Sequence, residues 1–258
     1  MVTKKLTKAA ANPYETELLV SQYCEFHYGR DYFGVRNFPA RCARLCVRFM
    51  GERERVRALD VGCAVGRSSF ELARYFPQVT GVDFSERFIR VARLMGEAGS
   101  ISYGMTVEGE LLEPVERRLA DVGLDGVRER VQFIRADAMA LPEELGGFDL
   151  IFAGNLIDRL PAPRRFLSSI HERLDPQGLL VLTSPYTWLP EFTPREEWLG
   201  GFMRDREELL TLDGLKEILA SRFRLAAEPL DVPFVMRETA RKYQHTIAQM
   251  TVWERRPV

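Results

Sequence analysis

Hydrophobic runs alternate with amphipathic stretches through the middle of the chain. Five short runs have the composition of buried strands: residues 56–61, 79–83, 131–135, 148–153 and 178–184. The segments between them predict helices over Arg67–Phe76, from a Ser85 cap to about Met95, and over Pro163–Leu174. Short strands that alternate with helices form a parallel sheet covered on both faces, so the pattern predicts the α/β class.

The flanks of this alternating region are less regular. A helix is predicted from Pro39, because one apolar stripe follows at helical spacing: Cys42, Leu45, Cys46 and Phe49. This stripe favours core packing for the cysteine pair over a metal pair.

Three further elements are expected in the remaining segments. Within residues 96–130 we expect a helix near Pro114–Val122. Two late strands are predicted over Arg222–Asp231 and Ile247–Glu254, joined by a polar link over residues 232–246. A link of that length is often functional and is long enough to fold over a pocket.

Composition narrows the class of protein further. The 258 residues suit one domain, and 36 Lys and Arg against 37 Asp and Glu give a net charge of −1, which argues against a dedicated nucleic-acid binder. No apolar run reaches the roughly 18 residues that a membrane-spanning helix needs. Residues 1–13 lack the apolar core of a secretory signal, so we expect a flexible tail and a cytoplasmic protein.

The cysteines and histidines do not suggest metal binding. Cys24, Cys42, Cys46 and Cys63 contain no CxxC pair, and we expect free thiols in a reducing compartment. The three histidines lie far apart without zinc-type spacing, so no metal site is expected.

The segment Leu59–Ser68 carries the main chemical signal. Asp60 lies near the end of the first strand, and Gly62 and Gly66 let the backbone pass close to a ligand. The G-x-G-x-x-G fingerprint is not met, because Ala64 stands where the second glycine would be. The loop therefore suits a ligand without phosphate groups.

Polar residues follow four consecutive strands, at Asp60, Asp83, Asp137 and Asn155. An acid at the end of the second strand can accept hydrogen bonds from ribose hydroxyls, and Asp137 is placed to bind the exocyclic amine of adenine. A single acid of this kind is as often a helix cap, but four at one sheet edge beside a glycine loop predict a nucleoside-bearing cofactor.

This arrangement, over residues 56–185, resembles the class I S-adenosylmethionine-dependent methyltransferases. The resemblance implies a Rossmann-like, mostly parallel sheet of seven strands with helices on both faces. The last strand, which residues 247–254 would supply, is antiparallel and is inserted between the fifth and sixth. It implies S-adenosylmethionine as cofactor, S-adenosylhomocysteine as product and no metal. The implied cofactor-binding residues are Asp60, Gly62, Cys63, Gly66, Asp83, Phe84, Ser85, Asp137, Ala138 and Asn155, with Cys63 as a small packing residue.

A finer resemblance extends from Tyr14 to Arg255. The blocks FHYG (26–29), FGV-NFP (33–39), GCAVGRSSFELA (62–73), AGNLIDRL (153–160) and YTWL-EFTP (186–194) are similar to the methyltransferase family of ovothiol biosynthesis. This resemblance implies a stand-alone enzyme that methylates a ring nitrogen of 5-thiohistidine (4-mercaptohistidine). The sulfur-inserting region that often precedes this module is absent, so a separate sulfoxide synthase is the expected functional partner.

We accordingly expect one domain over residues 14–258. It comprises a cap over residues 14–55, a cofactor-binding core over 56–185, and a substrate-side loop with late strands over 186–258. An amino-acid substrate calls for Arg toward its carboxylate, Asn or Asp toward its amine, and aromatic walls for its ring.

Candidate residues follow from these requirements. Catalytic candidates are His27, Tyr28 and Asn155; substrate-binding candidates are Tyr14, Asn37, Asp158, Tyr186, Trp188, Arg237 and Arg241. Simpler roles remain open. Tyr28 and Trp188 are equally suited to packing, His27 to a structural hydrogen bond, and the arginine pair to a solvated helix face.

Rival functions also remain open. The acceptor could be another small amine or thiol, or the chain could be a non-catalytic module that binds the cofactor and serves a partner enzyme. A nucleic-acid methyltransferase is disfavoured, because Asn155-Leu156-Ile157-Asp158 lacks the Asn/Asp-Pro-Pro-Tyr/Phe motif after the fourth strand.

Overall fold

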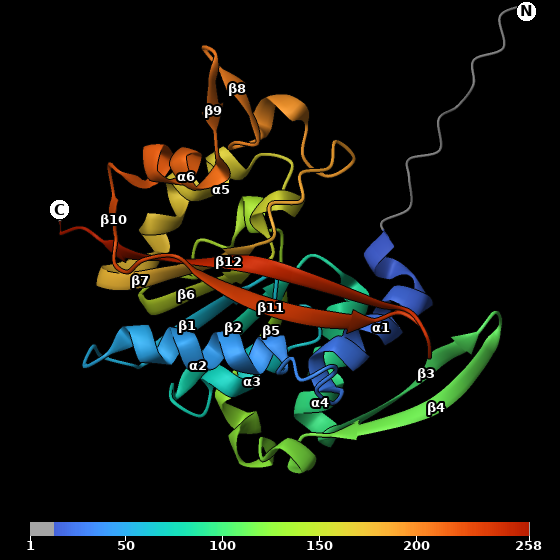
Figure 1. Cartoon of the computed structure of the whole chain (residues 1–258). Coiled ribbons are helices and arrows are strands. Elements are labelled where there is room, and N and C mark those ends of the chain that lie inside the picture. The colour runs from blue at the N-terminus through green and yellow to red at the C-terminus, as the bar shows by residue number, and fades with distance from the viewer. Residues whose placement is uncertain (1–12, 258) are drawn as a thin grey trace, which may run out of the picture.

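A computed structural model describes residues 13–257. Within them, an eight-stranded sheet lies between two layers of helices, with α5 and α6 on one side and α2, α3 and α4 on the other (Figure 1). The strand order is β10-β12-β7-β6-β1-β2-β5, and β11 pairs with residues 243–250 of β12, away from the stretch that pairs with β10. The sheet is mixed, and its parallel part carries the predicted site.

Five parallel strands form that part of the sheet, as the hydrophobic pattern predicted. They are β1 (Arg57–Val61), β2 (Gln78–Asp83), β5 (Val131–Arg135), β6 (Phe148–Gly154) and β7 (Leu174–Ser184). Successive residues of β6 enter different cores: Ile151 packs with the α5 and α6 layer, and Leu150 and Phe152 pack with the α2 and α3 layer. Burial on both faces explains why these strands are continuous apolar runs in the sequence.

The helices begin at residues that satisfy their first N–H groups. Asn37 accepts the Ala40 N–H and Ser85 accepts the Phe88 N–H at their respective helix starts. The α-helices are α1 (Glu17–Tyr28), α2 (Phe38–Met50), α3 (Arg67–Leu72), α4 (Glu86–Ala98), α5 (Pro163–Ser169) and α6 (Thr211–Leu219). Short 3-10 helices are η1 (Pro13–Glu15), η2 (Ala120–Val122), η3 (Asp125–Arg130), η4 (Ala138–Ala140), η5 (Ile157–Arg159), η6 (Ile170–Arg173) and η7 (Arg195–Glu197).

The apolar stripe of α2 packs into the core as predicted. Cys42, Cys46 and Met50 are fully buried against β1, β6 and α3. All four cysteines are buried free thiols. Among residues 13–257 there is no group of three His, Cys, Asp or Glu side chains that could hold a metal ion.

The C-terminal strands differ from the prediction. Antiparallel β12 (Tyr243–Arg255) does lie between β7 and β10 (Phe223–Leu225), but most of the predicted polar link belongs to strands: a further strand, β11 (Leu230–Arg237), and the start of β12. Pro233 obscured this strand in the sequence. It is tolerated because β11 is an edge strand that pairs only with β12. The sheet therefore has eight strands rather than seven, and the link shortens to residues 238–242.

The helix predicted near Pro114–Val122 is wrong for most of its length. Residues 100–118 form a β-hairpin of β3 (Ser100–Glu108) and β4 (Leu111–Arg118), which projects from the body (Figure 1). Alternate residues of β4 are exposed, and Pro114 lies opposite Gly104. A second small hairpin, β8 (Phe202–Arg204) and β9 (Glu207–Leu209), precedes α6.

Two expectations concern the ends and the environment of the chain. The predicted tail falls outside the described residues except for Pro13, which opens η1. None of the helices within residues 13–257 is long and apolar enough to cross a membrane.

Candidate functional site

The loop after β1 turns sharply under the end of β2. Gly62 and Gly66 have φ of 75° and 90°, values that side chains with a Cβ rarely adopt. A Cβ on Gly66 would lie 2.6 Å from the Phe133 ring, so the residue must be glycine. Ala64, at the place of the missing glycine, also takes a left-handed φ, of 46°. The loop thus has left-handed backbone at residues 62, 64 and 66, although residue 64 is an alanine and not a glycine.

Asp60 lies beneath this loop. Its Oδ2 accepts hydrogen bonds from the Ser68 and Ser69 hydroxyls, both at 2.6 Å, and these fix the first turn of α3. Burial raises the pKa of Asp60 to about 6. The structure therefore gives Asp60 a positioning role under the loop, whereas the sequence suggested direct contact with the cofactor.

Asp83 joins the loop to α4. Its Oδ2 accepts the Ala64 N–H and its Oδ1 accepts the Ser85 N–H, each at 2.9 Å. Burial raises the pKa of Asp83 to about 6. A carboxylate has about four lone-pair sites, so two remain for a ligand after these bonds. The next residue, Phe84, exposes 57% of its surface, which is unusual for a large apolar side chain and leaves a ring face for a ligand.

Asp137 and Asn155 complete the carboxyl edge of the sheet. Asp137 is exposed and caps η4, its Oδ1 accepting the Met139 N–H at 2.8 Å, which leaves the second oxygen for a donor. Ala138 follows and packs against the central core. Asn155 has a φ of 51°, and its Oδ1 accepts the Thr183 hydroxyl at 3.1 Å. Strong local hydrogen bonding therefore holds each strand-end residue in place.

Asp158 has the most unusual environment at this edge. Its side chain is fully buried, and its Oδ2 accepts bonds from Arg159 at 2.9 Å and from the Thr187 N–H at 3.1 Å. Its Oδ1 is buried with no hydrogen-bond partner among the described residues. Burial raises the pKa of Asp158, and the Arg159 charge and the Ser184 side chain beside the carboxyl oppose this shift. A buried oxygen without a donor is costly unless a ligand supplies one.

Aromatic rings gather beside Asp158 and Arg159. The Tyr14 ring lies 5.9 Å from Phe88 and 6.1 Å from Phe192, and Tyr23 lies 4.7 Å from Phe88. Arg159 stands over the Phe192 ring at 5.1 Å. Burial raises the pKa of Tyr14, and the charges of Arg159, Asp158 and Asp83 also act on that hydroxyl. These rings and charges therefore form one site.

Sequence reasoning included Tyr14 but missed four members of this cluster: Tyr23, Phe88, Arg159 and Phe192. For Tyr23 a signal was present, since it precedes the candidate His27 by one helical turn. Arg159 and Phe192 lie in the blocks at 153–160 and 186–194 that carry the finer resemblance, whereas no sequence feature indicated that Phe88 would join them.

His27 and Tyr28 attach α1 to the loop. The Tyr28 hydroxyl donates to the Val65 carbonyl at 2.7 Å, and His27 Nδ1 accepts the Arg67 N–H at 3.3 Å. Burial, together with the Arg67 charge, lowers the pKa of His27 to about 3. The neutral ring with Nδ1 engaged carries its proton on Nε2 and has no free lone pair. This geometry favours positioning roles for both residues over the catalytic roles predicted for them.

Four predicted substrate residues lie in other structural roles. Asn37 caps α2 and donates to the Phe26 and His27 carbonyls. Trp188 is buried, and its Nε1 donates to the Thr211 hydroxyl. Arg237 ends β11 and pairs with Glu113 at 2.6 Å, and Arg241 lies in the short turn before β12. The predicted lid with two arginines is therefore wrong, because β11 takes up the part of the link with Arg237 and only a five-residue turn with Arg241 remains.

Tyr186 lies nearer the site. Its hydroxyl donates to Gln249 Oε1 at 2.9 Å, and its φ of 55° places it in the left-handed region. Burial raises its pKa, and the Asp158 charge adds to the effect. Cys63 is buried and its N–H donates to the Val82 carbonyl, in keeping with the packing role expected for its side chain.

A parallel sheet with a glycine loop and polar side chains at its carboxyl edge defines a Rossmann-like α/β protein with its ligand site at that edge. Residues 52–222 match the family model described as Methyltransferase domain. The chain belongs to this methyltransferase family.

Individual relatives are more distant. The chain is 29% identical over 128 residues to the ubiquinone biosynthesis O-methyltransferase of Xanthomonas oryzae pv. oryzae; the match covers 50% of this chain and 42% of that enzyme. The chain thus spans less than half the length of that relative.

Two solved structures have the same fold. One is magnesium protoporphyrin IX methyltransferase from Synechocystis PCC 6803 with bound SAM, with a TM-score of 0.57, 15% identity and coverage of 96% of this chain and 100% of that one. The other is the N-methyltransferase NodS from Bradyrhizobium japonicum WM9 with S-adenosylhomocysteine, with a TM-score of 0.54, 14% identity and coverage of 93% and 99%. At these identities the likeness concerns the fold alone.

Proposed function

We propose that this protein transfers a methyl group from S-adenosylmethionine to a ring nitrogen of 5-thiohistidine, which a separate sulfur-inserting enzyme supplies. Membership of the methyltransferase family supports the reaction class. The sequence blocks at residues 26–29, 33–39 and 153–160 support the acceptor, because they are similar to the ovothiol-biosynthesis methyltransferases. The observation that carries the proposal is the unpartnered Oδ1 of Asp158.

The strand-end residues fit this cofactor. Asp83 retains acceptor capacity for ribose hydroxyls, Phe84 offers an exposed ring to adenine, and the free oxygen of Asp137 suits the exocyclic amine. The left-handed turns at Gly62 and Gly66 remove side chains from the path of the ligand. S-adenosylmethionine supplies an electrophilic methyl group on a sulfonium centre.

Asp158 and Arg159 fit the two charged groups of an amino acid. An ammonium group that donates to Asp158 Oδ1 satisfies the one buried side-chain oxygen that has no hydrogen-bond partner within residues 13–257. Arg159 keeps 26% of its side chain exposed and stands over Phe192, so it is placed to meet a carboxylate. Arg159 therefore takes the role that the sequence assigned to Arg237 and Arg241.

The cluster of Tyr14, Tyr23, Phe88 and Phe192 suits a flat ring between aromatic walls. A neutral imidazole nitrogen already has the electron pair that attacks the methyl carbon. The thiolate on the same ring neutralises the positive charge that the ring gains, so no strong base is required. The chain's contribution is then to hold acceptor and donor in line and to exclude water.

The proposal is tested by incubating the protein and S-adenosylmethionine with 5-thiohistidine, with histidine, and with a panel of small amines, thiols and phenols. The expected result is a mass gain of one methyl group on 5-thiohistidine, well ahead of every other acceptor. Preference for another amine or thiol, or for a hydroxyl as in the O-methyltransferase relatives, would replace the acceptor. Cofactor binding without turnover on any acceptor would indicate a non-catalytic module.

A matched pair of variants tests the role of Asp158. Asp158→Asn keeps the shape of the side chain but removes its charge, and we expect KM for the acceptor to rise about 10- to 100-fold, as for loss of a charged hydrogen bond. Asp175→Asn, at an exposed acid, is the control and leaves KM unchanged. Equal KM values for the two variants would remove Asp158 from substrate recognition.

A further inference from the structure

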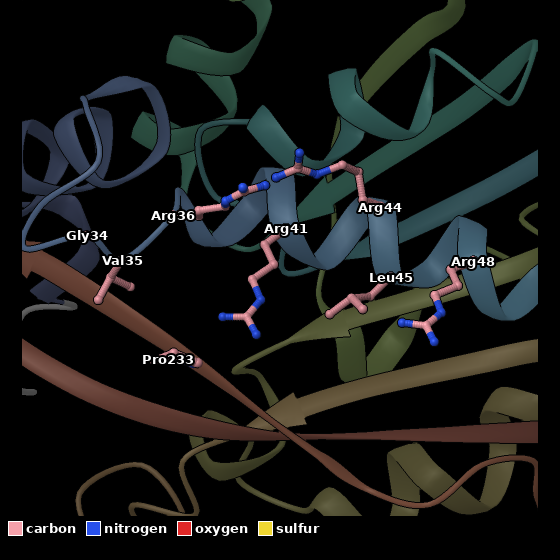
Figure 2. Close-up of a pocket in the computed structure, with 8 residues that line it drawn as sticks. All are labelled: Gly34, Val35, Arg36, Arg41, Arg44, Leu45, Arg48 and Pro233. Carbon is pink, nitrogen blue, oxygen red and sulfur yellow. The ribbon is translucent and has the colours of Figure 1, made fainter.

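A groove of about 570 Å³ lies between α2 and the edge strand β11, outside the site described above. Four arginines line it: Arg36, Arg41, Arg44 and Arg48. Leu45 from α2 and Pro233 from β11 are among the apolar residues of its lining. Figure 2 shows Arg41 and Arg48 projecting from α2 toward the strand with Pro233, and Arg36 and Arg44 extending toward each other. No residue of the glycine loop or the strand ends belongs to this lining.

The positive charge of this groove is not compensated by the protein. None of the four guanidinium groups has a hydrogen bond or ion pair within residues 13–257, and the lining contains no Asp or Glu. Several arginines elsewhere are paired with acids, as Arg67 is with Glu71 and Arg117 with Glu25. The whole chain has a net charge of −1, so this is a local excess. Like charges held together repel, and a bound anion relieves that repulsion.

The helix that presents these groups is firmly held. Arg41, Arg44 and Arg48 recur at intervals of three and four residues, so they share one side of α2. The buried side of the helix, with Cys42 and Cys46, is fixed in the core, and Asn37 caps its start. The guanidinium groups are therefore presented from a rigid support.

The lining also restricts the kind of anion. Pro233 removes a backbone donor from the free edge of β11, which disfavours addition of a peptide strand there. No aromatic ring lines the groove, so it has no platform for stacking a nucleobase. Guanidinium groups pair with phosphoryl oxygens in a bidentate manner, and four of them match a ligand with several negative charges.

We propose that this groove is a binding site for a compact soluble anion with two or more phosphoryl groups, separate from the methyl-transfer site. The anion contacts Arg41 and Arg48 directly, with Arg36 and Arg44 adding to the field. Its affinity falls steeply as salt rises, because the contacts are ionic and partly exposed. The two sites share no residue, so S-adenosylhomocysteine and the anion bind together.

Calorimetric titration of the full chain with pyrophosphate at low salt tests this site. Pyrophosphate is expected to bind at one site, at least tenfold more tightly than inorganic phosphate, with or without saturating S-adenosylhomocysteine. The double variant Arg41→Gln/Arg48→Gln should weaken this binding at least tenfold. The matched control Arg165→Gln/Arg206→Gln removes the same charge at two exposed arginines and should bind like the parent.

Three outcomes would overturn the proposal. The first is equal affinity in the two double variants, and the second is no binding of pyrophosphate by the parent. The third is binding of duplex DNA or of anionic lipid vesicles, lost in Arg41→Gln/Arg48→Gln, with no binding of pyrophosphate. Circular dichroism of each variant shows that a loss of binding is not a loss of fold.

Discussion

The Asp83 carboxylate accepts the backbone N–H of Ala64 at 2.9 Å, so the end of β2 holds the middle of the β1 loop. Ala64 sits in a left-handed conformation that an alanine rarely adopts. The hydrogen bond from Asp83 offsets part of this conformational cost, which a glycine at residue 64 would not incur. One residue thus supports the loop and remains available to the ligand.

The raised pKa of Asp83 makes cofactor binding depend on pH. Ribose hydroxyls donate to the ionised carboxyl, so affinity for S-adenosylhomocysteine should rise as pH increases through about 6. At pH 5 about a tenth of the carboxyl is ionised, and binding should be about tenfold weaker than at pH 7.5. Calorimetry at several pH values measures this.

Two variants separate Asp83 from its neighbour. Asp83→Asn should abolish the pH dependence, whereas Asp60→Asn should retain it, because Asp60 has a similar pKa of about 6 but lies beneath the loop. If the pH dependence disappeared only in Asp60→Asn, the titrating group would be Asp60, and the prediction for Asp83 would be wrong.

The stability contributed by Asp60 and Asp83 changes with pH in the opposite direction to cofactor binding. Each has a folded-state pKa of about 6, raised from 3.8. Their contribution to stability is therefore fully present below pH 3.8 and is lost as pH rises through about 6. Improved binding near neutral pH is thus obtained at the expense of stability in the ligand-free protein.

Gly66→Ala should destabilise the protein and weaken cofactor binding. A Cβ would lie 2.6 Å from the Phe133 ring at a φ of 90°, and the combined strain and overpacking should cost about 1–3 kcal/mol of unfolding free energy. Gly126→Ala is the control, since its Cβ would meet no atom within 4 Å. Urea unfolding of both variants measures the difference; equal stability would show that the loop tolerates a side chain at residue 66.

His27 should act by position and not by proton transfer. His27→Gln keeps an acceptor for the Arg67 N–H, so turnover and its pH profile should stay close to those of the parent. His27→Ala leaves that buried N–H unpaired and should lower the unfolding free energy by about 1–3 kcal/mol. Loss of turnover in His27→Gln, with unfolding unchanged, would restore the catalytic role.

The parallel core was predictable because its signals are local. Each buried strand is an apolar run, three of them ending near Asp60, Asp83 and Asp137, and the helices carry their caps and stripes in sequence. Because parallel strands place their carboxyl ends at one edge of the sheet, the sequence alone predicts that these residues meet there.

The elements that were missed lack such signals. The β3–β4 hairpin has no fully buried face, and β11 contains a proline. Mistaking β11 for a loop put Arg237 over the pocket, although it pairs with Glu113 of the hairpin. The contacts that bring Phe88 and Phe192 to Tyr14 and Tyr23 arise from tertiary packing, which no spacing in the chain encodes.

A crystal structure with S-adenosylhomocysteine and 5-thiohistidine tests the central claim most directly. We expect a ring nitrogen of the acceptor to face the cofactor sulfur, with the acceptor's ammonium on Asp158 Oδ1 and its carboxylate on Arg159. An acceptor bound with its ammonium away from Asp158, or a cofactor held away from Asp83 and Asp137, would contradict the account.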